Sequence, residues 1–292
     1  MVIVNDGTDV FLSDELINSY PFKIEYYKES HVGVSETRNR CLDHSVADYV
    51  MFCDADDMFY SVNAFWIIFR EIDKHHFDTM VSNFIEEGCI NGDMVYLNHK
   101  DDHTFVHGKV HRRGYLFENQ IRWQKDLTIH EDSYFNIMTW ELTSSRLYYP
   151  EPYYLWKYRK ESVCRSDPQY ILKTYDQLIK TIDRLVSDFN DRGMREKAVF
   201  HTCYGIIKTY YELNLPRWRD EANLQYKEKV EKAIYDFGVR HAKEWDEGTL
   251  KIKQDIANDQ RNTAVKSGML FEELTLNQWL SKIIEKYRKN DN

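Results

Sequence analysis

The sequence has 292 residues, of which 42% are hydrophobic and 15% aromatic, and its mean hydropathy is -0.65. This composition excludes a disordered chain and an integral membrane protein, so we expect a globular, water-soluble protein of one large domain or two modest ones. The 48 acidic side chains against 39 basic ones give a net charge of -9, which opposes a phosphate backbone and disfavours nucleic acid as a partner.

The first part of the sequence alternates between strand-like and helix-like patterns. Short apolar runs bounded by polar or glycine-containing turns predict strands over residues 2–5, 23–27, 49–53, 78–84 and 93–98. Apolar residues at helical spacing predict helices over residues 13–20, 35–45 and 64–76. Because strands and helices alternate, we expect an α/β domain over residues 1–160, with a sheet flanked by helices.

After Pro150 the sequence changes to long, charged, amphipathic stretches, such as residues 170–189 and 224–245. In the first stretch, apolar residues recur at spacings of three and four and therefore share one helix face; they are Leu172, Tyr175, Leu178, Ile179, Ile182 and Leu185. We therefore expect residues 161–292 to form a mostly α-helical C-terminal domain, with the boundary near residue 160.

The N-terminus and the cysteines indicate the compartment. Residues 1–10 lack the basic and hydrophobic regions of a signal peptide, and no apolar stretch is long enough to span a membrane. The five cysteines have no CxxC spacing, so we interpret them as free thiols and expect no zinc site. These features predict a cytoplasmic protein without a membrane span.

The most informative segment is an acidic turn formed by Asp54, Ala55, Asp56 and Asp57, directly after the predicted strand 49–53. An apolar strand that ends in carboxylates marks the edge where open α/β sheets bind ligands. Two aspartates one residue apart suit a hard divalent cation, Mg²⁺ or Mn²⁺, together with a ribose hydroxyl. For an isolated Asp-x-Asp, a solvated acidic turn is the alternative interpretation.

With its neighbours, this turn resembles the inverting glycosyltransferases of family 2. Residues 5–9 are similar to the family's VDDGSTD turn, and residues 54–57 match its DxDD segment. Between them, Gly33, Arg38 and Asn39 match the segment N-x-G-x-s-x-A-R-N, although His31 stands where Asn is usual and Thr37 where Ala is usual.

The resemblance continues downstream of the acidic turn. Residues 105–136 are similar to the family's W-x-K-l-y-r-r-x-x-l-x-x-n-x-i-x-F pattern and its following carboxylate pair, which here is Glu131 and Asp132 after His130. The residues in register with the pattern are Lys109, Arg112, Arg113, Asn119, Ile121 and Trp123. Residues 154–166 resemble the family's closing Y-Y-R-x-x-x-S-x-S segment and contain Arg159.

The resemblance implies a GT-A (Rossmann-like) mixed sheet and a hexosyl- or pentosyltransferase that uses a nucleotide sugar, with a UDP-sugar as the expected donor. It assigns Asp132 as the catalytic base, Asp54 and Asp56 to the Mn²⁺ or Mg²⁺ ion, and Asp6, Arg38, Asp54 and Asp56 to the nucleotide sugar. Further candidate contacts to the acceptor or diphosphate are Lys109, Glu131, His130, Trp123 and Arg159. The expected acceptor is the hydroxyl of a glycan, a lipid-linked molecule or another compound.

Several of these residues also have a structural interpretation. Arg38 could pair with an acidic neighbour on a helix face, and Glu131 and Asp132 could be N-terminal charges that stabilise a helix over residues 133–142. We interpret His107 and His130 primarily as structural hydrogen-bonding residues, while keeping His130 as a candidate contact.

One departure from the family concerns the N-terminus. Family members normally begin with a strand and a Pro-x-x-N-like turn before the VDDGSTD turn, whereas this sequence begins at the family's second strand. That first strand normally lies between the second strand and the strand that carries Asp-x-Asp. Its absence would leave two internal edges with unpaired backbone groups. We expect either that the reading frame continues upstream of Met1 or that another segment fills the gap.

Three other functions compete with this one. The first is a viral-type enzyme that glycosylates hydroxymethylated DNA bases. It requires one exposed basic face, formed by Lys109, His111, Arg112, Arg113, Arg122 and Lys125. The second is a catalytically inactive GT-A-like binding module, which the missing strand motivates. The third, a nucleotidyltransferase that uses the acidic turn alone, leaves Glu131 and Asp132 unexplained.

Overall fold

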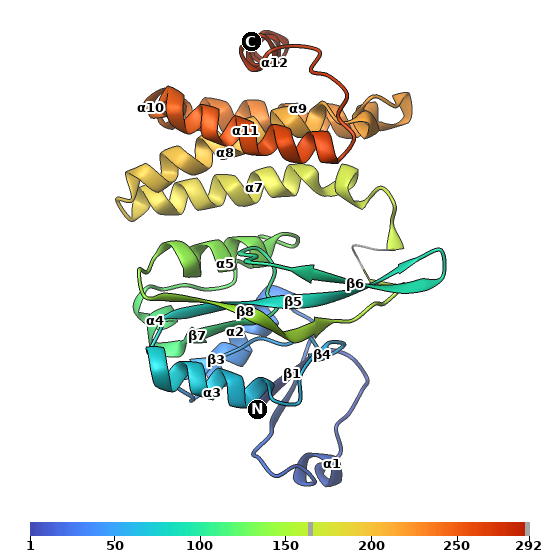
Figure 1. The fold of residues 1–292 in the computed structure, drawn as a ribbon, viewed down its shortest axis with the longest axis vertical. Helices are drawn as coiled ribbons and strands as arrows, with labels where there is room; N and C mark the ends of the chain where they lie inside the picture. Colours follow the sequence, from blue (N-terminus) through green and yellow to red (C-terminus); the bar gives the residue numbers. More distant parts are fainter. Residues whose placement is uncertain (163–165, 290–292) are drawn as a thin grey trace. The chain divides into compact units, whose positions relative to one another are not determined.

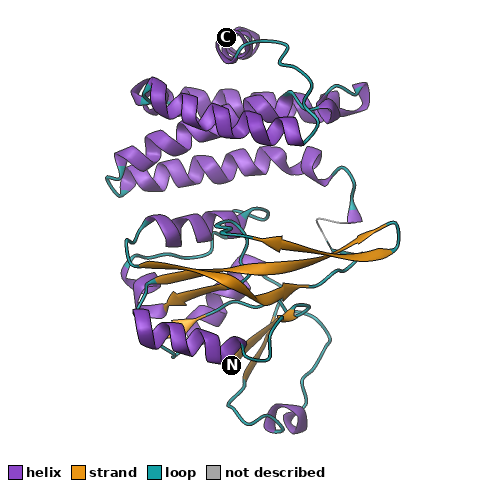
Figure 2. Cartoon of the chain, viewed as in Figure 1, coloured by secondary structure: helices purple, strands orange, loops and turns teal. Residues whose placement is uncertain are grey.

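A computed structural model of the chain describes residues 1–162 and 166–289. The chain divides into two compact units, Met1–Ser162 and Val163–Asn292 (Figure 1). Within the described residues, every strand belongs to the first unit, as the colouring in Figure 2 shows. Cys164 and part of the segment 154–166, which resembles the family's closing motif, lie outside the described residues.

The N-terminal end of unit 1 forms a small sheet of two parallel strands, β1 (Val2–Asp6) and β2 (Glu25–Glu29). A short helix, α1 (Asp14–Asn18), lies in the connection between these strands, and α2 (Val34–His44) follows β2. The α2 helix contacts β1 and buries Ser35, Arg38, Asn39 and Leu42. Strand β1 therefore leads into the region where α2 begins.

The larger sheet of unit 1 has six strands. They are β3 (Tyr49–Val50), β4 (Met58–Phe59), β5 (Thr79–Ile90), β6 (Asp93–His99), β7 (Lys109–Arg112) and β8 (Arg146–Trp156). The strand order is β3-β7-β5-β8-β4, and β6 forms a hairpin with the second half of β5. The sheet is mixed, because β5 and β8 are parallel whereas the other pairs are antiparallel.

Helices cover both faces of this sheet, with α3 (Ala64–His75) on one face and α5 (Glu131–Glu141) on the other (Figure 1). Ala64 and Ile68 of α3 pack against Met80, Phe84 and Val110 of the sheet. Side chains alternate between the two faces of a strand, so the neighbours of Val110 on β7 point toward the α5 face. A third helix, α4 (Arg113–Glu118), directly follows β7.

The two sheets of unit 1 are not joined by hydrogen bonds. In the part of the chain that the structure describes, β1 pairs only with β2, and β3 pairs only with β7. No described strand fills the position between β1 and β3, which is where the resemblance places the missing first strand. The expected pair of open edges is therefore present.

Some predicted bounds shift, since the strand predicted over residues 23–27 is β2 at Glu25–Glu29 and the helix predicted over residues 13–20 is α1 at Asp14–Asn18. Two other elements differ more. The strand predicted over residues 49–53 pairs only at Tyr49 and Val50, with Arg112 and His111 of β7. The helix predicted over residues 224–245 is two helices, since His241 leaves helical backbone geometry between them. The His241 ring instead forms a 2.6 Å contact with Asp183.

Unit 2 is built from helices in its described residues. The α-helices are α7 (Tyr170–Asp191), α8 (Arg195–Leu213), α9 (Leu224–Arg240), α10 (Ala242–Glu247), α11 (Leu250–Lys266) and α12 (Leu276–Arg288). Two short 3-10 helices, η1 (Pro216–Trp218) and η2 (Glu221–Asn223), connect α8 to α9. The predicted face of α7 is buried at Leu172, Ile179 and Leu185. None of the described helices combines the length and apolar character needed to cross a bilayer.

Candidate active site

The acidic turn lies between β3 and β4, where the backbone leaves the sheet. Asp54 accepts a 2.8 Å hydrogen bond from Nη2 of Arg38 on α2. Nη1 of the same guanidinium donates a 3.1 Å hydrogen bond to Glu131 at the start of α5. Arg38 is buried, and its guanidinium stacks on the Trp123 ring at 4.5 Å. One arginine thus connects the acidic turn with the second carboxylate pair.

The second carboxylate pair, Glu131 and Asp132, occupies the first turn of α5. His130, which precedes the helix, has a φ of 63°, a left-handed conformation that is uncommon for a residue other than glycine. Such backbone conformations persist where the surrounding structure enforces them and are concentrated at functional sites. Asp132 also accepts a 2.8 Å hydrogen bond from the Ser133 amide. The sequence prediction that both acids lie at a helix N-terminus therefore agrees with the structure.

The environment of Asp132 favours its protonated form. Burial is the main cause that raises the pKa of Asp132, and the adjacent charge of Glu131 raises it further. Burial also raises the pKa of Glu131, and Arg38 opposes that increase. A carboxyl group with a raised pKa can exchange a proton near neutral pH, as a general base must.

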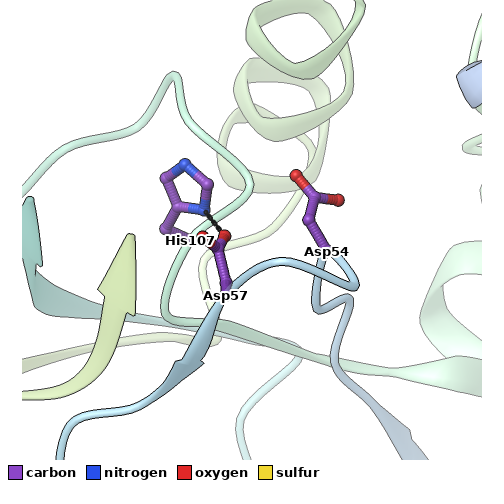
Figure 3. A group of neighbouring side chains, drawn as sticks. All are labelled: Asp54, Asp57 and His107. Atoms are coloured by element: carbon purple, nitrogen blue, oxygen red, sulfur yellow. Dashed lines mark ion pairs between the residues drawn. The ribbon is translucent and has the colours of Figure 1, made fainter. Parts of the chain in front are cut away.

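A different set of groups surrounds Asp57. Its carboxylate accepts a 2.6 Å hydrogen bond from the Tyr154 hydroxyl and a 3.0 Å hydrogen bond from the Lys157 amide. Nδ1 of His107 lies 3.6 Å from Asp57 Oδ2, and Figure 3 shows this nitrogen directed at the carboxylate. Burial is the main cause that raises the pKa of Asp57 to about 6.

His107 is held in a box of aromatic rings. It stacks on Phe105, Tyr154 and Trp156, and Phe84 meets it at an angle. Burial lowers the pKa of His107 to about 4, so the ring is neutral at neutral pH. Its Nδ1 atom is buried without a hydrogen-bond partner among the described residues, so the interpretation of His107 as a structural hydrogen-bonding residue fails at this nitrogen.

Asp54, Asp57 and His107 together meet the chemical requirements of a divalent-cation site. Each can offer one ligand atom, and the three atoms lie within 4.8 Å of one another (Figure 3). Two carboxylate oxygens and one neutral imidazole nitrogen form a common donor set for divalent metals. The residues present are thus compatible with the metal ion that the sequence predicts.

Asp56 lies on the outer side of the acidic turn. Its carboxylate forms a 2.6 Å ion pair with Nη1 of Arg159, and both side chains are exposed. The sequence predicts that both residues act near the diphosphate, and the structure brings them together.

Asp6 contacts the protein backbone in this structure. Its carboxylate accepts hydrogen bonds of 2.6 and 3.1 Å from the amides of Val32 and Gly33, just before α2. Burial opposes ionisation, but these amides and His31 outweigh it and lower the pKa of Asp6 overall. Gly7 permits this approach, because a Cβ atom there would lie 2.7 Å from the His31 amide nitrogen. Asp6 thus links β1 to the start of α2.

Two further predicted contact residues are buried. Lys109 is 1% exposed, and its ammonium donates a hydrogen bond to the Phe105 carbonyl. Burial lowers the pKa of Lys109 to about 8. Trp123 is also 1% exposed and stacks on Phe135 at 4.2 Å. Because both side chains are buried, they support the residues of the site and do not form its surface.

The basic face that the DNA-modifying alternative requires is not formed. Lys109 and His111 are buried, so neither can reach a phosphate backbone. The remaining basic residues are engaged locally. Arg112 pairs with Asp78 and Glu118, Arg113 donates to Ser45, Arg122 pairs with Asp43, and Lys125 pairs with Glu36.

Sequence reasoning missed Asp57 and His107 as site residues. Asp57 was matched to the DxDD pattern but received no role. A signal for His107 was available, since His107 stands where the family pattern W-x-K has Trp, directly before Gly108 and Lys109. A polar residue at an aromatic position of a pattern indicates a changed local chemistry.

The fold and the site define the class of protein. A mixed sheet flanked by helices, an acidic turn after a strand and a carboxylate pair at the start of α5 are the features of a GT-A glycosyltransferase. Residues 1–138 match the family model described as glycosyl transferase family 2, so this part of the chain is a domain of that family. Residues 1–138 thus have the family and the fold of a glycosyltransferase.

Solved structures with the same fold include S. aureus TarS. The TarS 1–349 structure is 14% identical, with 99% of this chain and 82% of that chain covered and a TM-score of 0.60. TarS 1–349 in complex with UDP-GlcNAc is 15% identical at the same coverage, with a TM-score of 0.62. The structure of TarS itself is 14% identical, with 91% of this chain and 49% of that chain covered and a TM-score of 0.58. No curated protein sequence matches this chain.

Proposed function

We propose that this protein transfers a sugar from a UDP-sugar to an acceptor hydroxyl with inversion at the anomeric carbon, in a reaction that depends on a divalent cation. The observation that carries the proposal is the Arg38 bridge, which joins the acidic turn to the carboxylate pair of α5. The family of residues 1–138 supports the reaction class. The complex of TarS 1–349 with UDP-GlcNAc supports a UDP-sugar as the donor.

In this proposal Asp132 is the catalytic base. A direct displacement requires one group that takes the proton of the acceptor hydroxyl as the new bond forms. The raised pKa of Asp132 suits this task, because a base works best when its pKa lies near the working pH. Glu131, fixed by Arg38, positions the first turn of α5 and keeps a second negative charge beside Asp132.

The acidic turn and Arg159 would bind the donor diphosphate. A divalent cation held at this turn would supply positive charge that stabilises the departing diphosphate. The family resemblance assigns Asp54 and Asp56 to that cation in the donor complex. Arg159, which pairs with Asp56, can exchange this partner for a phosphate oxygen, because guanidinium groups bind both anions in the same forked geometry. Asp6, Arg38, Lys109, His130 and Trp123 then support the nucleotide and acceptor sites, directly or through these residues.

A GT-A-like binding module remains the main competing function, since β1 and β3 each keep an open edge in the described residues. Such a module would bind the nucleotide sugar without transferring its sugar. The partly buried pair Glu131 and Asp132 favours the enzyme, because binding alone gives no reason to place two adjacent carboxyl groups where the pKa of each is raised.

Calorimetry with UDP tests the donor assignment. Wild-type protein should bind UDP more tightly with Mn²⁺ than with EDTA, and Asp56→Ala should lose this metal-dependent gain. The exposed acid Asp73 on α3 provides a matched control, Asp73→Ala, which should bind UDP as wild type does. Equal UDP affinity with and without Mn²⁺ in the wild type would contradict the metal-dependent proposal.

A further inference from the structure

We propose that Asp54, Asp57 and His107 bind a first-row transition-metal ion, and that this site takes up the ion before any nucleotide is present. The inference deepens the proposed function, because the ion would lie at the same acidic turn as the donor diphosphate. It differs from the family assignment, which uses Asp54 and Asp56.

The spacing of the three ligand atoms fits one small cation. Carboxylate oxygens and imidazole nitrogens bind such ions at about 2.0 to 2.2 Å, so two ligands of one ion lie roughly 3 to 4.4 Å apart. Nδ1 of His107 and Oδ2 of Asp57 are 3.6 Å apart, and all three ligand atoms lie within 4.8 Å of one another. A movement of less than about 1 Å completes the site.

The His107 nitrogen provides an independent indication of a ligand. The side chain is 95% buried, and Nδ1 has no hydrogen-bond partner among the described residues. The 3.6 Å separation from Asp57 is too long for a hydrogen bond. Leaving a buried polar atom without a partner is destabilising. A cation between the nitrogen and the carboxylates would satisfy all of these electron-rich atoms at once.

The surroundings hold the two buried ligands in place. Tyr154 and the Lys157 amide donate hydrogen bonds to Asp57 and fix its orientation, as groups around a metal site commonly do. The Phe105 and Trp156 rings both contact the neutral His107 ring, with centroids 5.8 and 4.9 Å away. Because these contacts do not involve the ion, they restrict the two side chains independently of it.

The donor set determines the class of ion. Mg²⁺ strongly prefers oxygen ligands in a near-ideal octahedron, whereas an imidazole nitrogen improves binding of first-row transition metals. Two carboxylates and one imidazole therefore favour Mn²⁺ and the later divalent ions over Mg²⁺. Asp56 is not part of this set, since it pairs with Arg159.

The test measures Mn²⁺ binding to the full chain without nucleotide. Electron paramagnetic resonance of free Mn²⁺, after EDTA treatment and dialysis, should show one ion per chain, and Mg²⁺ should compete weakly. His107→Phe keeps an aromatic ring in the box but removes the nitrogen, and it should weaken Mn²⁺ binding at least tenfold. Asp57→Asn should act similarly. The exposed-histidine control His75→Phe should bind within about twofold of wild type.

A direct readout on the wild type protects the test against variants that fail to fold. Electron spin-echo modulation of the Mn²⁺-loaded protein should show coupling to one imidazole nitrogen. Absence of that coupling, or wild-type protein that takes up no Mn²⁺ without UDP, overturns the inference. Binding that is lost in Asp56→Ala but kept in His107→Phe also overturns it. In these cases metal-dependent UDP binding would still support the proposed function, so the two failures are distinguishable.

Discussion

The two units of the chain differ in the side chains that are buried in their central elements. Unit 1 concentrates buried charged and polar groups near the acidic turn, where Arg38, His107 and Lys109 lie close to the site carboxylates. The interior of α7 and α8 in unit 2 is largely aliphatic and aromatic, as at Leu185 and Ile207. Buried charge costs free energy unless it is paired, whereas apolar burial stabilises. The difference indicates that unit 1 carries the chemistry and that α7 and α8 carry fold stability.

The largest expected effect is on turnover in unit 1. Asp132→Asn keeps the size of the side chain but cannot accept a proton near neutral pH. Sugar transfer should fall by about 10² to 10⁴-fold, while UDP and Mn²⁺ affinities stay near wild type. Asp73→Asn, on the exposed side of α3, is the control and should transfer normally. Transfer by Asp132→Asn at the wild-type rate would make Asp132 a helix-terminal charge and turn attention to Glu131.

The next effect is on stability, and it compares the loss of a buried ion pair with the loss of a more exposed one. Arg38→Met leaves Asp54 and Glu131 without their shared partner, and breaking a buried ion pair costs about 3 to 5 kcal/mol. Urea unfolding at neutral pH measures this loss. Arg122→Met removes the more exposed pair with Asp43 and should cost about 0 to 1 kcal/mol. Similar losses in the two variants would mean that the Arg38 bridge is no more stabilising than a surface pair.

A substitution in unit 2 separates stability from function. Leu185 on α7 is 0% exposed, so Leu185→Ala should lower the free energy of unfolding by about 2 to 5 kcal/mol. UDP affinity of the folded protein should not change, because no residue of the proposed site lies on α7. Calorimetry below the unfolding transition checks this. A loss of UDP affinity without unfolding would contradict the assignment of the chemistry to unit 1.

The smallest effect concerns pH. Burial, then the charge of Glu131, raises the pKa of Asp132 from the ordinary 3.8 to about 7. Below that pH the base is protonated, so the transfer rate should fall about tenfold per pH unit and level off above it. Stability should respond with the opposite sign. The folded state binds the extra proton between these two pKa values, so the free energy of unfolding decreases as pH rises through that window. Asp132→Asn should remove this contribution to the pH dependence of both the transfer rate and the free energy of unfolding.

The sequence was informative where one local pattern decides the structure. The spacing of Leu172, Ile179 and Leu185 predicted the buried face of α7, and the acidic pair Glu131 and Asp132 predicted a helix start. The resemblance also predicted the class of protein and the open edges of β1 and β3. In these cases the deciding residues are neighbours or repeat at a fixed spacing.

The sequence was less informative where distant residues decide the structure. The Arg38 bridge joins residues 16 and 93 positions away, and no local pattern specifies both partners. Strand β3 pairs at two residues only, and its partner β7 is a segment distant in the sequence. His107 became a candidate ligand only when its burial and its missing hydrogen bond were known.

Release of UDP from UDP-sugars tests the central claim most directly. Many nucleotide-sugar sites hydrolyse their donor slowly without an acceptor, with water taking the place of the hydroxyl. A panel of nucleotide sugars with Mn²⁺, followed by chromatography, should show UDP release from at least one UDP-sugar. The release should stop with EDTA and with Asp132→Asn. UDP binding without release from any nucleotide sugar, with or without a panel of glycan acceptors, would contradict the account and identify a binding module.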